Sequence, residues 1–221
     1  APGCAAQHAA GHDRAPAGKG LNFAVSGAQT CTGAGRKVKD ATLGYGMSNQ
    51  VQDFVASVHQ GEVKFDPATT LFFIAGGLND GRLTTEVTIA NLKEEIAELH
   101  GVGARAFAIA LLPTKIPQFS RVGLRLNPAL AELATTLRLE GATIRASHWG
   151  EFFDDVIEHP AAYGIVNTKD ACAGRALFDQ DTTPKGDPKI YFFFHEGHPS
   201  TAVHQIVGEK LAQELLGAKR P

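Results

Sequence analysis

The stretch TLFFIAGGLNDG, residues 70–81, joins a short apolar run to a polar turn rich in glycine. The apolar part, 70–77, is short and rich in Phe and Ile, which predicts a buried strand. A second run, ARAFAIALLP at 104–113, is apolar without interruption. Such strands are expected where helices cover both faces of a sheet. The two runs therefore predict a mostly parallel sheet in an α/β fold.

Amphipathic segments alternate with apolar runs along the rest of the chain. Further strands are predicted over 21–27, 142–147 and 190–194. Helical periodicity predicts helices over 48–61, 84–101, 126–141, 148–159 and 200–216. We expect Ser48 to cap the first of these helices, Gly61 to end it, and Ser200 or Thr201 to cap the last one. Strands that alternate with helices indicate a sheet covered by helices on both sides.

Length and composition limit the class of protein. The chain has 221 residues, of which 43% are hydrophobic and 20% charged, with a formal net charge of -2. This is ordinary globular composition, and no block of Lys and Arg indicates nucleic-acid binding. No apolar run approaches the roughly 18 residues of a transmembrane helix. We assign residues 1–20, which are rich in Ala, Gly and Pro, to a loop or linker, and 21–221 to one domain.

The segment HEGH, residues 195–198, raises the question of a metal site. A zinc-binding H-E-x-x-H motif needs its two histidines on one face of a helix. Here the histidines are one residue closer together, and Gly197 and Pro199 would interrupt a helix. A metal site is therefore not expected. His198 instead lies between the last predicted strand and helix, where a rigid histidine suits general base catalysis. The alternative is a polar loop histidine without a role.

Three loops follow predicted strands, at the sheet edge where α/β proteins bind ligands. They are 26–28, 76–81 and 195–200. The Asn79 side-chain amide and the Gly27 backbone N–H are hydrogen-bond donors of the kind that stabilise an oxyanion. The alternative for 76–81 is a simple turn, because Asn, Asp and Gly are common turn residues.

The segments NFAVSGA, FFIAGGLNDG and HEGHPSTAVH resemble the second, third and fifth sequence blocks of the SGNH/GDSL esterases and lipases. The resemblance runs from about residue 20 to the end, and is greatest to the bacterial lipase/phospholipase branch. It implies a three-layer α/β/α, flavodoxin-like SGNH hydrolase fold. It also implies an exported serine hydrolase, secreted or periplasmic, that cleaves acyl esters of small molecules or lipids without a cofactor or metal. Gly27 and Asn79 would be its oxyanion-hole donors and His198 its catalytic base.

The chain departs from the family pattern at the catalytic acid. The family has an Asp three residues before the catalytic His, and this position is His195 here. Glu196 is the nearest carboxylate and a candidate orienting acid. A backbone carbonyl, or a Ser-His dyad without an acid, are the alternatives. Glu196 is otherwise a solvated loop residue.

The second departure concerns the nucleophile. The family's Gly-Asp-Ser block has no match, because none of Ser26, Ser48, Ser57, Ser120, Ser147 and Ser200 follows Gly-Asp. The resemblance implies that the first, nucleophile-bearing strand is absent and that the chain is N-terminally incomplete. One alternative is a catalytically inactive SGNH-like domain that binds ligands. Another is a flavodoxin-like nucleotide-binding domain, which the absence of G-x-G-x-x-G and P-loop motifs disfavours.

The cysteines are Cys4, Cys31 and Cys172, with no C-x-x-C spacing. Because the resemblance implies export, a disulfide between Cys172 and either of the others would fit it. Three unpaired thiols are the alternative.

Overall fold

The computed structural model describes residues 20–217. The predicted loop or linker at 1–20 lies almost entirely outside these residues. The described residues form two compact units, one of 20–109 together with 129–145, the other of 110–128 together with 146–217.

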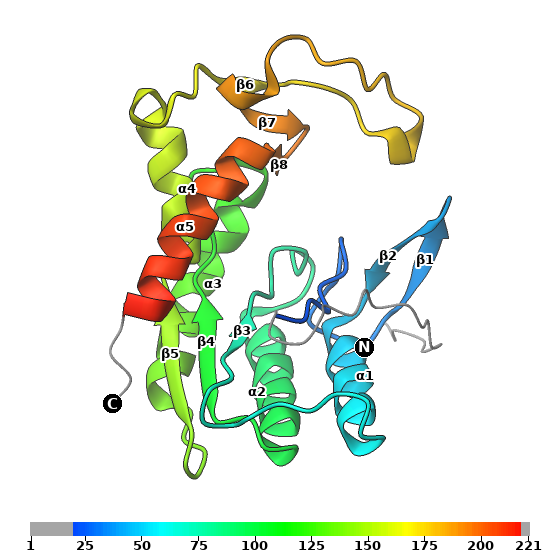
Figure 1. Cartoon of the computed structure of the whole chain (residues 1–221), viewed down its shortest axis with the longest axis vertical. Helices are drawn as coiled ribbons and strands as arrows, with labels where there is room; N and C mark the ends of the chain where they lie inside the picture. Colours follow the sequence, from blue (N-terminus) through cyan, green and yellow to red (C-terminus); the bar gives the residue numbers. More distant parts are fainter. Residues whose placement is uncertain (1–19, 218–221) are drawn as a thin grey trace. The chain divides into compact units, whose positions relative to one another are not determined.

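The main sheet of the first unit has three strands in the order β3-β4-β5 (Figure 1). Its strands and the helices of this unit are β3 (Phe72–Ile74), β4 (Ala106–Ala110), β5 (Thr143–Ser147), α1 (Met47–His59) and α2 (Thr85–Gly101). β3 and β4 are parallel, with Phe72 opposite Phe107. The α/β class and the strand-helix alternation predicted from the sequence are confirmed.

The core of the first unit follows from these apolar patterns. Leu92, Ile96 and Leu99 recur at helical spacing on α2 and are almost completely buried. On β4, the successive residues Phe107, Ala108 and Ile109 are each no more than 1% exposed. Consecutive strand residues point to opposite faces, so burial of successive residues requires cover on both faces, as the uninterrupted apolar run predicted.

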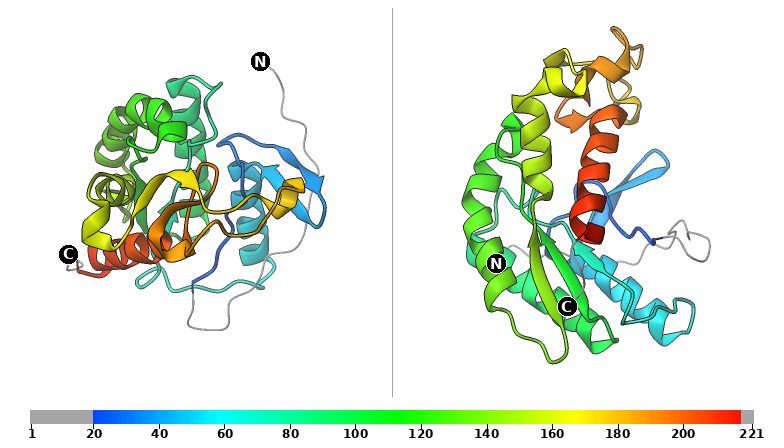
Figure 2. Two further views of the ribbon diagram at one scale, coloured as in Figure 1. Left: turned by 90° about the horizontal axis from the view of Figure 1, so that it is seen from above. Right: turned by 60° about the vertical axis from the view of Figure 1, so that its left-hand side comes forward.

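Residues 21–27 do not form the predicted strand. Among the described residues this segment belongs to no sheet, although the Ser26 carbonyl accepts a hydrogen bond from Gly44 N–H at 2.8 Å. The strand pair in this region is an antiparallel hairpin of β1 (Ala34–Val38) and β2 (Ala41–Tyr45), visible beside α1 in Figure 2. Its polar first strand gave no apolar pattern. The apolar run at 21–27 therefore predicted a strand where there is none, while the two strands of this region follow it in the sequence.

The first helix begins one residue before Ser48. Gly46 is the N-cap of α1, and no side chain caps it, so the prediction of a Ser48 cap was wrong. The Ser48 hydroxyl contacts the Thr30 carbonyl and Glu95 instead. Gly61 follows the C-cap with φ +72°, a conformation that glycine adopts readily, and ends the helix as predicted.

The second unit contains a separate three-stranded sheet, in the order β6-β7-β8. β6 and β7 are parallel, whereas β7 and β8 are antiparallel. The predicted last strand therefore exists as β7 but belongs to this second sheet and not to the first. The strands and helices of this part of the chain are β6 (Asn167–Ala171), β7 (Tyr191–His195), β8 (His198–Pro199), α3 (Pro117–Thr136), α4 (Trp149–Glu158), α5 (Thr201–Gly217) and the 3-10 turns η1 (Pro160–Tyr163), η2 (Ala176–Phe178) and η3 (Pro188–Ile190).

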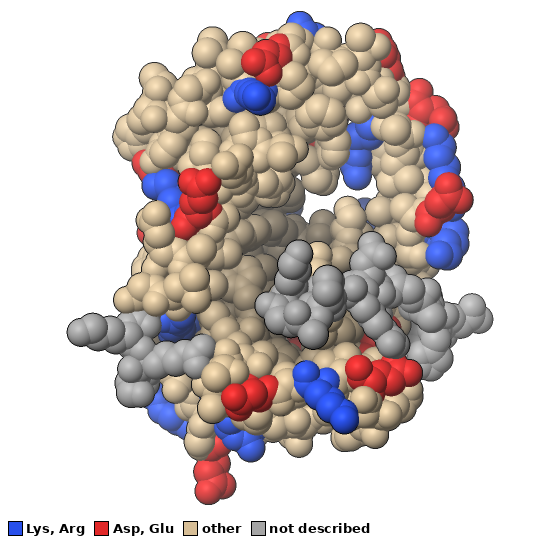
Figure 3. Space-filling model, in the orientation of Figure 1, with Lys and Arg blue, Asp and Glu red and all other residues tan. Residues whose placement is uncertain are grey.

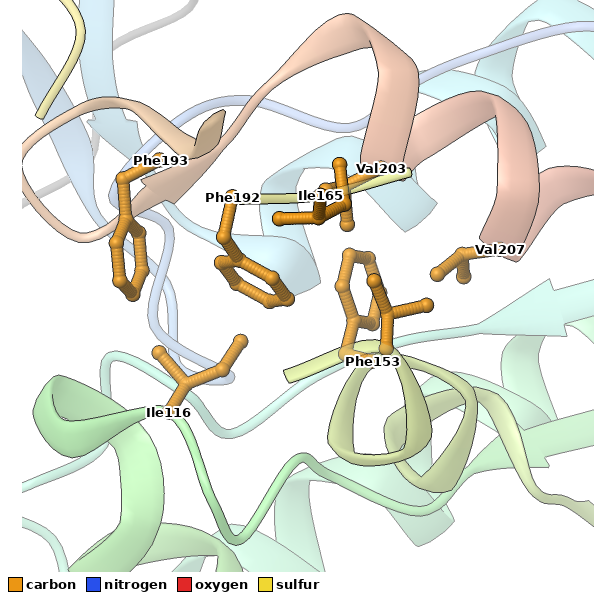
Figure 4. Close-up of a cluster of buried hydrophobic side chains, with 8 residues drawn as sticks. Ile116, Phe153, Ile165, Phe192, Phe193, Val203 and Val207 are labelled. Atoms are coloured by element: carbon orange, nitrogen blue, oxygen red, sulfur yellow. The ribbon is translucent and has the colours of Figure 1, made fainter. Parts of the chain in front are cut away.

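An apolar cluster holds β7 against α4 and α5 (Figure 4). Phe192 and Phe193 project from β7, Phe153 from α4, and Val203 and Val207 from α5. Phe192 and Val203 are fully buried. Burial of side chains of this size contributes about 1.5–3 kcal/mol each. The cluster therefore fixes the strand that ends at His195.

Asp155 on α4 ties this helix to its neighbours. Its carboxylate accepts hydrogen bonds from Lys210 Nζ at 2.8 Å, from the Tyr163 hydroxyl, and from His159 Nδ1 at 2.9 Å. The Lys210 bond, followed by the Tyr163 bond, lowers the pKa of Asp155 to about 2. A carboxyl group whose pKa is lowered by folding stabilises the fold at pH values above its unfolded-state pKa. This stability is lost as the pH falls through the folded-state pKa.

We expect Asp155→Asn to lower the free energy of unfolding at neutral pH. The difference between wild type and variant should shrink as the pH falls from about 4 to about 2, because the wild-type carboxylate takes up its proton in this interval. Urea denaturation over a pH series measures both quantities. Glu151→Gln, on the exposed side of the same helix, is the control. A constant difference across the series would contradict the assignment.

Three further observations bear on the sequence predictions. Cys172 and Cys31 do not form a disulfide, and the buried Cys172 Sγ lies 3.7 Å from the Gly186 carbonyl oxygen; Cys4, the other possible partner, lies outside the described residues. Within residues 20–217 there is no helix with the length and apolar character needed to span a bilayer. Acidic and basic side chains are intermixed on the face shown in Figure 3.

Candidate active site

Residues 26–30, which we call the strap, lie in the first unit and include Gly27. Four of its carbonyl groups accept hydrogen bonds from elsewhere in the first unit, one of them Thr30 O, from Ser48 Oγ at 3.0 Å. Ser26 O accepts from Gly44 N–H at 2.8 Å, Ala28 O from Asn79 Nδ2 at 3.0 Å, and Gln29 O from Met47 N–H at 2.9 Å. The strap is irregular backbone, but these bonds hold it.

Gly27 lies on this strap with φ +78°, a conformation that residues with a Cβ rarely adopt. The neighbouring Ala28 N–H closes a turn by donating to Val25 O at 3.2 Å. In contrast, the Gly27 N–H has no acceptor among residues 20–217, and the residue is exposed. The turn therefore presents a backbone donor at this position.

Asn79 lies in the turn that follows β3 and is also exposed. One N–H of its side-chain amide donates to Ala28 O, and Gln29 Nε2 donates to the Asn79 carbonyl at 3.1 Å. A carboxamide has two N–H groups, so one of them remains for a ligand. The structure thus brings together Gly27 and Asn79, the two donors that the sequence predicted.

Asp80 is a residue of this site that sequence reasoning missed. Its fully buried carboxylate accepts hydrogen bonds from Thr30 N–H at 3.1 Å, from Thr30 Oγ1 at 2.6 Å, and from Thr88 Oγ1 at 2.9 Å. These bonds join the strap, the turn after β3 and α2. Bonds from ionised groups are stronger than neutral ones. In the sequence Asp80 is indistinguishable from an ordinary turn residue, because its partner Thr30 lies 50 positions away.

His198, the predicted catalytic base, lies in the second unit. Glu196 and Gly197 form a two-residue turn between β7 and β8, and His195 pairs with His198 across it. Gly197 has φ +73°, which the turn requires. The HEGH segment is therefore a hairpin and not a helix. No group of three or more His, Cys, Asp or Glu residues suited to a metal ion is present in the part of the chain that the structure describes.

The His198 ring is oriented by a main-chain group. Its Nδ1 lies 2.9 Å from the carbonyl oxygen of Glu196. A carbonyl oxygen only accepts hydrogen bonds, so Nδ1 carries the proton and the neutral ring has its lone pair on Nε2. The Glu196 side chain is exposed. The Glu196 backbone carbonyl, and not its side-chain carboxylate, therefore makes this contact. A backbone carbonyl was one of the alternatives that the sequence analysis left open.

His195 occupies the position of the family's acid but has different electrostatics. Its ring centroid lies 4.3 Å from that of His198, and its buried Nδ1 has no hydrogen-bond partner within residues 20–217. Desolvation, and after it the positive charge of a protonated His198, lower the pKa of His195. A neutral imidazole does not supply the negative charge of a carboxylate.

The helix after His198 begins as predicted. Ser200 is 1% exposed, and its hydroxyl oxygen accepts a hydrogen bond from Val203 N–H at 3.3 Å. This is the contact of an N-cap residue. It fixes α5 directly after the hairpin that carries His198.

The Gly27 N–H and the Asn79 amide of the first unit, and the His198 imidazole of the second, are the kinds of group that ester hydrolases use. The family model described as "GDSL-like Lipase/Acylhydrolase" matches residues 6–211. The chain belongs to this family. Its members have the SGNH fold, and the parallel strand pair and five helices described above agree with a three-layer α/β/α fold.

Individual relatives agree with this assignment. The chain is 28% identical over 221 residues to a thermolabile hemolysin of Vibrio parahaemolyticus, an alignment that covers 87% of this chain and 50% of the hemolysin. It is 24% identical over 239 residues to a GDSL esterase/lipase of Arabidopsis thaliana, an alignment that covers 85% of this chain and 62% of the plant protein. GDSL esterase/lipase 7 of the same plant is 23% identical over 148 residues, an alignment that covers 55% of this chain and 41% of the plant protein. The chain thus spans about half the length of these relatives.

Proposed function

We propose that this chain is most of the catalytic domain of a serine hydrolase that cleaves carboxylic acyl esters, of small molecules or lipids, through an acyl-serine. The observation that carries the proposal is the pair of donors, Gly27 N–H and Asn79 Nδ2, on two loops that hydrogen bonds hold together. An oxyanion site needs donors that are fixed before the reaction, because reorganisation during the reaction would cost free energy.

In the proposed mechanism His198 Nε2 takes the proton from a serine hydroxyl while the serine oxygen attacks the ester carbonyl. Gly27 and Asn79 stabilise the oxyanion that forms. The carbon-oxygen bond to the alcohol then breaks, and the alcohol leaves with the proton from His198. Water attacks the acyl-serine by the same route, which releases the acid and restores the serine. The Glu196 carbonyl holds Nδ1–H throughout.

The proposal assigns the nucleophile to a Gly-Asp-Ser segment that precedes residue 1 in the full-length protein. No serine of the 221 residues follows Gly-Asp, and the chain spans half the length of the hemolysin that it resembles.

We expect a fluorophosphonate probe to label one serine of the full-length protein, and the protein to hydrolyse short p-nitrophenyl esters. Mass spectrometry of the labelled peptide locates the serine, and a residue outside Gly-Asp-Ser would overturn the assigned nucleophile. Heat-denatured protein is the control, because only an activated serine reacts rapidly with the probe.

An inactive, ligand-binding domain of the same family is the second candidate. The neutral His195 in place of an acid favours it, because the charge that would stabilise an imidazolium is missing. In this case the full-length protein would bind fatty acids or acyl esters in isothermal titration calorimetry but would not react with the probe.

Export to the periplasm or the medium, which the family resemblance implies, remains a prediction. Cell fractionation with an antibody against the chain tests it, and retention in the cytosolic fraction would contradict it.

A further inference from the structure

Glu95 on α2 is a buried carboxyl group behind the strap. Its side chain is 2% exposed. Oε1 lies 3.1 Å from Ser48 Oγ, while Oε2 has no hydrogen-bond partner among the described residues. A buried carboxylate with an unsatisfied oxygen is costly, whereas the carbonyl oxygen of a neutral acid tolerates this position better.

The hydrogen bonds of Ser48 also require a proton on Glu95. Ser48 Oγ lies 3.0 Å from the Thr30 carbonyl oxygen as well as 3.1 Å from Glu95 Oε1. A hydroxyl group has one proton to donate, and a carbonyl oxygen only accepts. The Ser48 proton therefore goes to Thr30 when both bonds are made. The proton between Ser48 and Glu95 must then belong to Glu95.

The surroundings of Glu95 favour its neutral form. Burial is the main effect and raises its pKa, while the Ser48 hydrogen bond acts in the opposite direction. The negative charges of Asp80, from the turn after β3, and of Glu98 and Glu94, from α2 itself, raise it further, and the pKa reaches about 8. From α1 the facing group is the uncharged Ser48.

We propose that Glu95 is a positioning residue, which holds the strap as a neutral acid through Ser48 and releases it on ionisation. When Glu95 is neutral, its O–H donates to Ser48 and the Ser48 proton holds the Thr30 carbonyl. When Glu95 loses its proton, Ser48 turns its own proton to the carboxylate and Thr30 O loses its donor. Thr30 also carries the bonds to Asp80 that join the strap to the turn of Asn79. The effect on catalysis rests on the proposed function of Gly27 and Asn79.

Glu95→Gln tests the proposal in the full-length protein. A glutamine amide donates to Ser48 as the neutral acid does, but it does not ionise. We expect the wild-type kcat/KM for a p-nitrophenyl ester to fall above about pH 8 and to level off about tenfold lower, because one hydrogen bond to the strap is lost. The Glu95→Gln variant should lack this alkaline decrease. A structural role of the side chain alone would not change the shape of the pH profile. The same decrease in both proteins would overturn the proposal.

A second measurement needs no enzymatic activity, and therefore separates failure of this inference from failure of the proposed function. We expect the backbone amide ¹⁵N and ¹H shifts of residues 27–30 to titrate with the Glu95 carboxyl ¹³C shift in wild type. In Glu95→Gln the amide shifts should not respond in this pH range. A carboxyl group that titrates near the usual pKa of glutamate, about 4.3, would overturn the proposal whether or not the protein hydrolyses esters.

Ser48→Ala tests the relay itself. In this variant Glu95 keeps its burial and its acidic neighbours, so the carboxyl group should still titrate at high pH. The strap amides should no longer follow it, because the link to the Thr30 carbonyl is gone. Strap amides that still follow Glu95 would contradict the route through Ser48.

Discussion

Replacement of His198 by alanine in the full-length protein is expected to lower kcat for p-nitrophenyl ester hydrolysis by about 10⁴-fold. The serine hydroxyl would have no acceptor for its proton during attack, and the alcohol would have no donor on leaving. The substrate KM should change little, since the ring acts on the reacting groups. Steady-state kinetics at saturating ester gives both constants.

The matched control is His59→Ala, an exposed histidine at the end of α1. It should keep the wild-type kcat. Thermal unfolding of both variants shows whether loss of activity reflects loss of the fold. If His198→Ala retained wild-type turnover with a wild-type melting temperature, His198 would not be the base, and the assignment of the HEGH hairpin to catalysis would fail.

Replacement of Asn79 by alanine is expected to lower kcat by about 10²- to 10³-fold, the usual loss for one oxyanion-hole donor. The oxyanion forms only in the transition state, so the loss should appear in kcat and much less in KM. The variant also loses the hydrogen bond from Asn79 Nδ2 to Ala28 O. Part of the effect would therefore reflect a looser strap.

Gln29→Ala separates these two causes. It removes the hydrogen bond from Gln29 Nε2 to the Asn79 carbonyl on the same turn, while the Asn79 amide remains. An exposed neutral hydrogen bond contributes about 0.5–1.5 kcal/mol, so the loss in kcat should be about tenfold or less. Equal losses in Gln29→Ala and Asn79→Ala would mean that Asn79 acts only as part of the loop.

Local chemistry indicated the candidate site residues. Asn79 follows a buried strand in a glycine-rich turn, and His198 lies between an apolar strand and a capped helix; these features are visible in short stretches of sequence. The group that orients His198 was not predictable in the same way. Whether the Glu196 side chain or its backbone carbonyl reaches Nδ1 depends on the two-residue turn between β7 and β8.

Asp80 and Glu95 show what a sequence pattern does not contain. Both have ordinary surroundings along the chain, one in a polar turn and one in a helix rich in glutamate. Asp80 is buried by contacts with Thr30 and Thr88, and Glu95 by contacts that include Ser48, 47 positions away. The raised pKa of Glu95 follows chiefly from desolvation, which exists only in the folded chain.

The sequence by itself determined the α/β class, the positions of α1, α2, α4 and α5, and the buried strands 72–74 and 106–110, because burial of one face imposes a local period on the chain. It misplaced α3, which begins at Pro117 and not at 126. Only the tertiary structure decided that 21–27 is not a strand, that β7 joins a second sheet, and that the strap presents Gly27 beside Asn79. A strand exists only where another segment pairs with its backbone, and a buried polar group is held by whichever partner packing brings to it. The pairing segment and the polar partner can both lie far along the sequence from the residue that they contact.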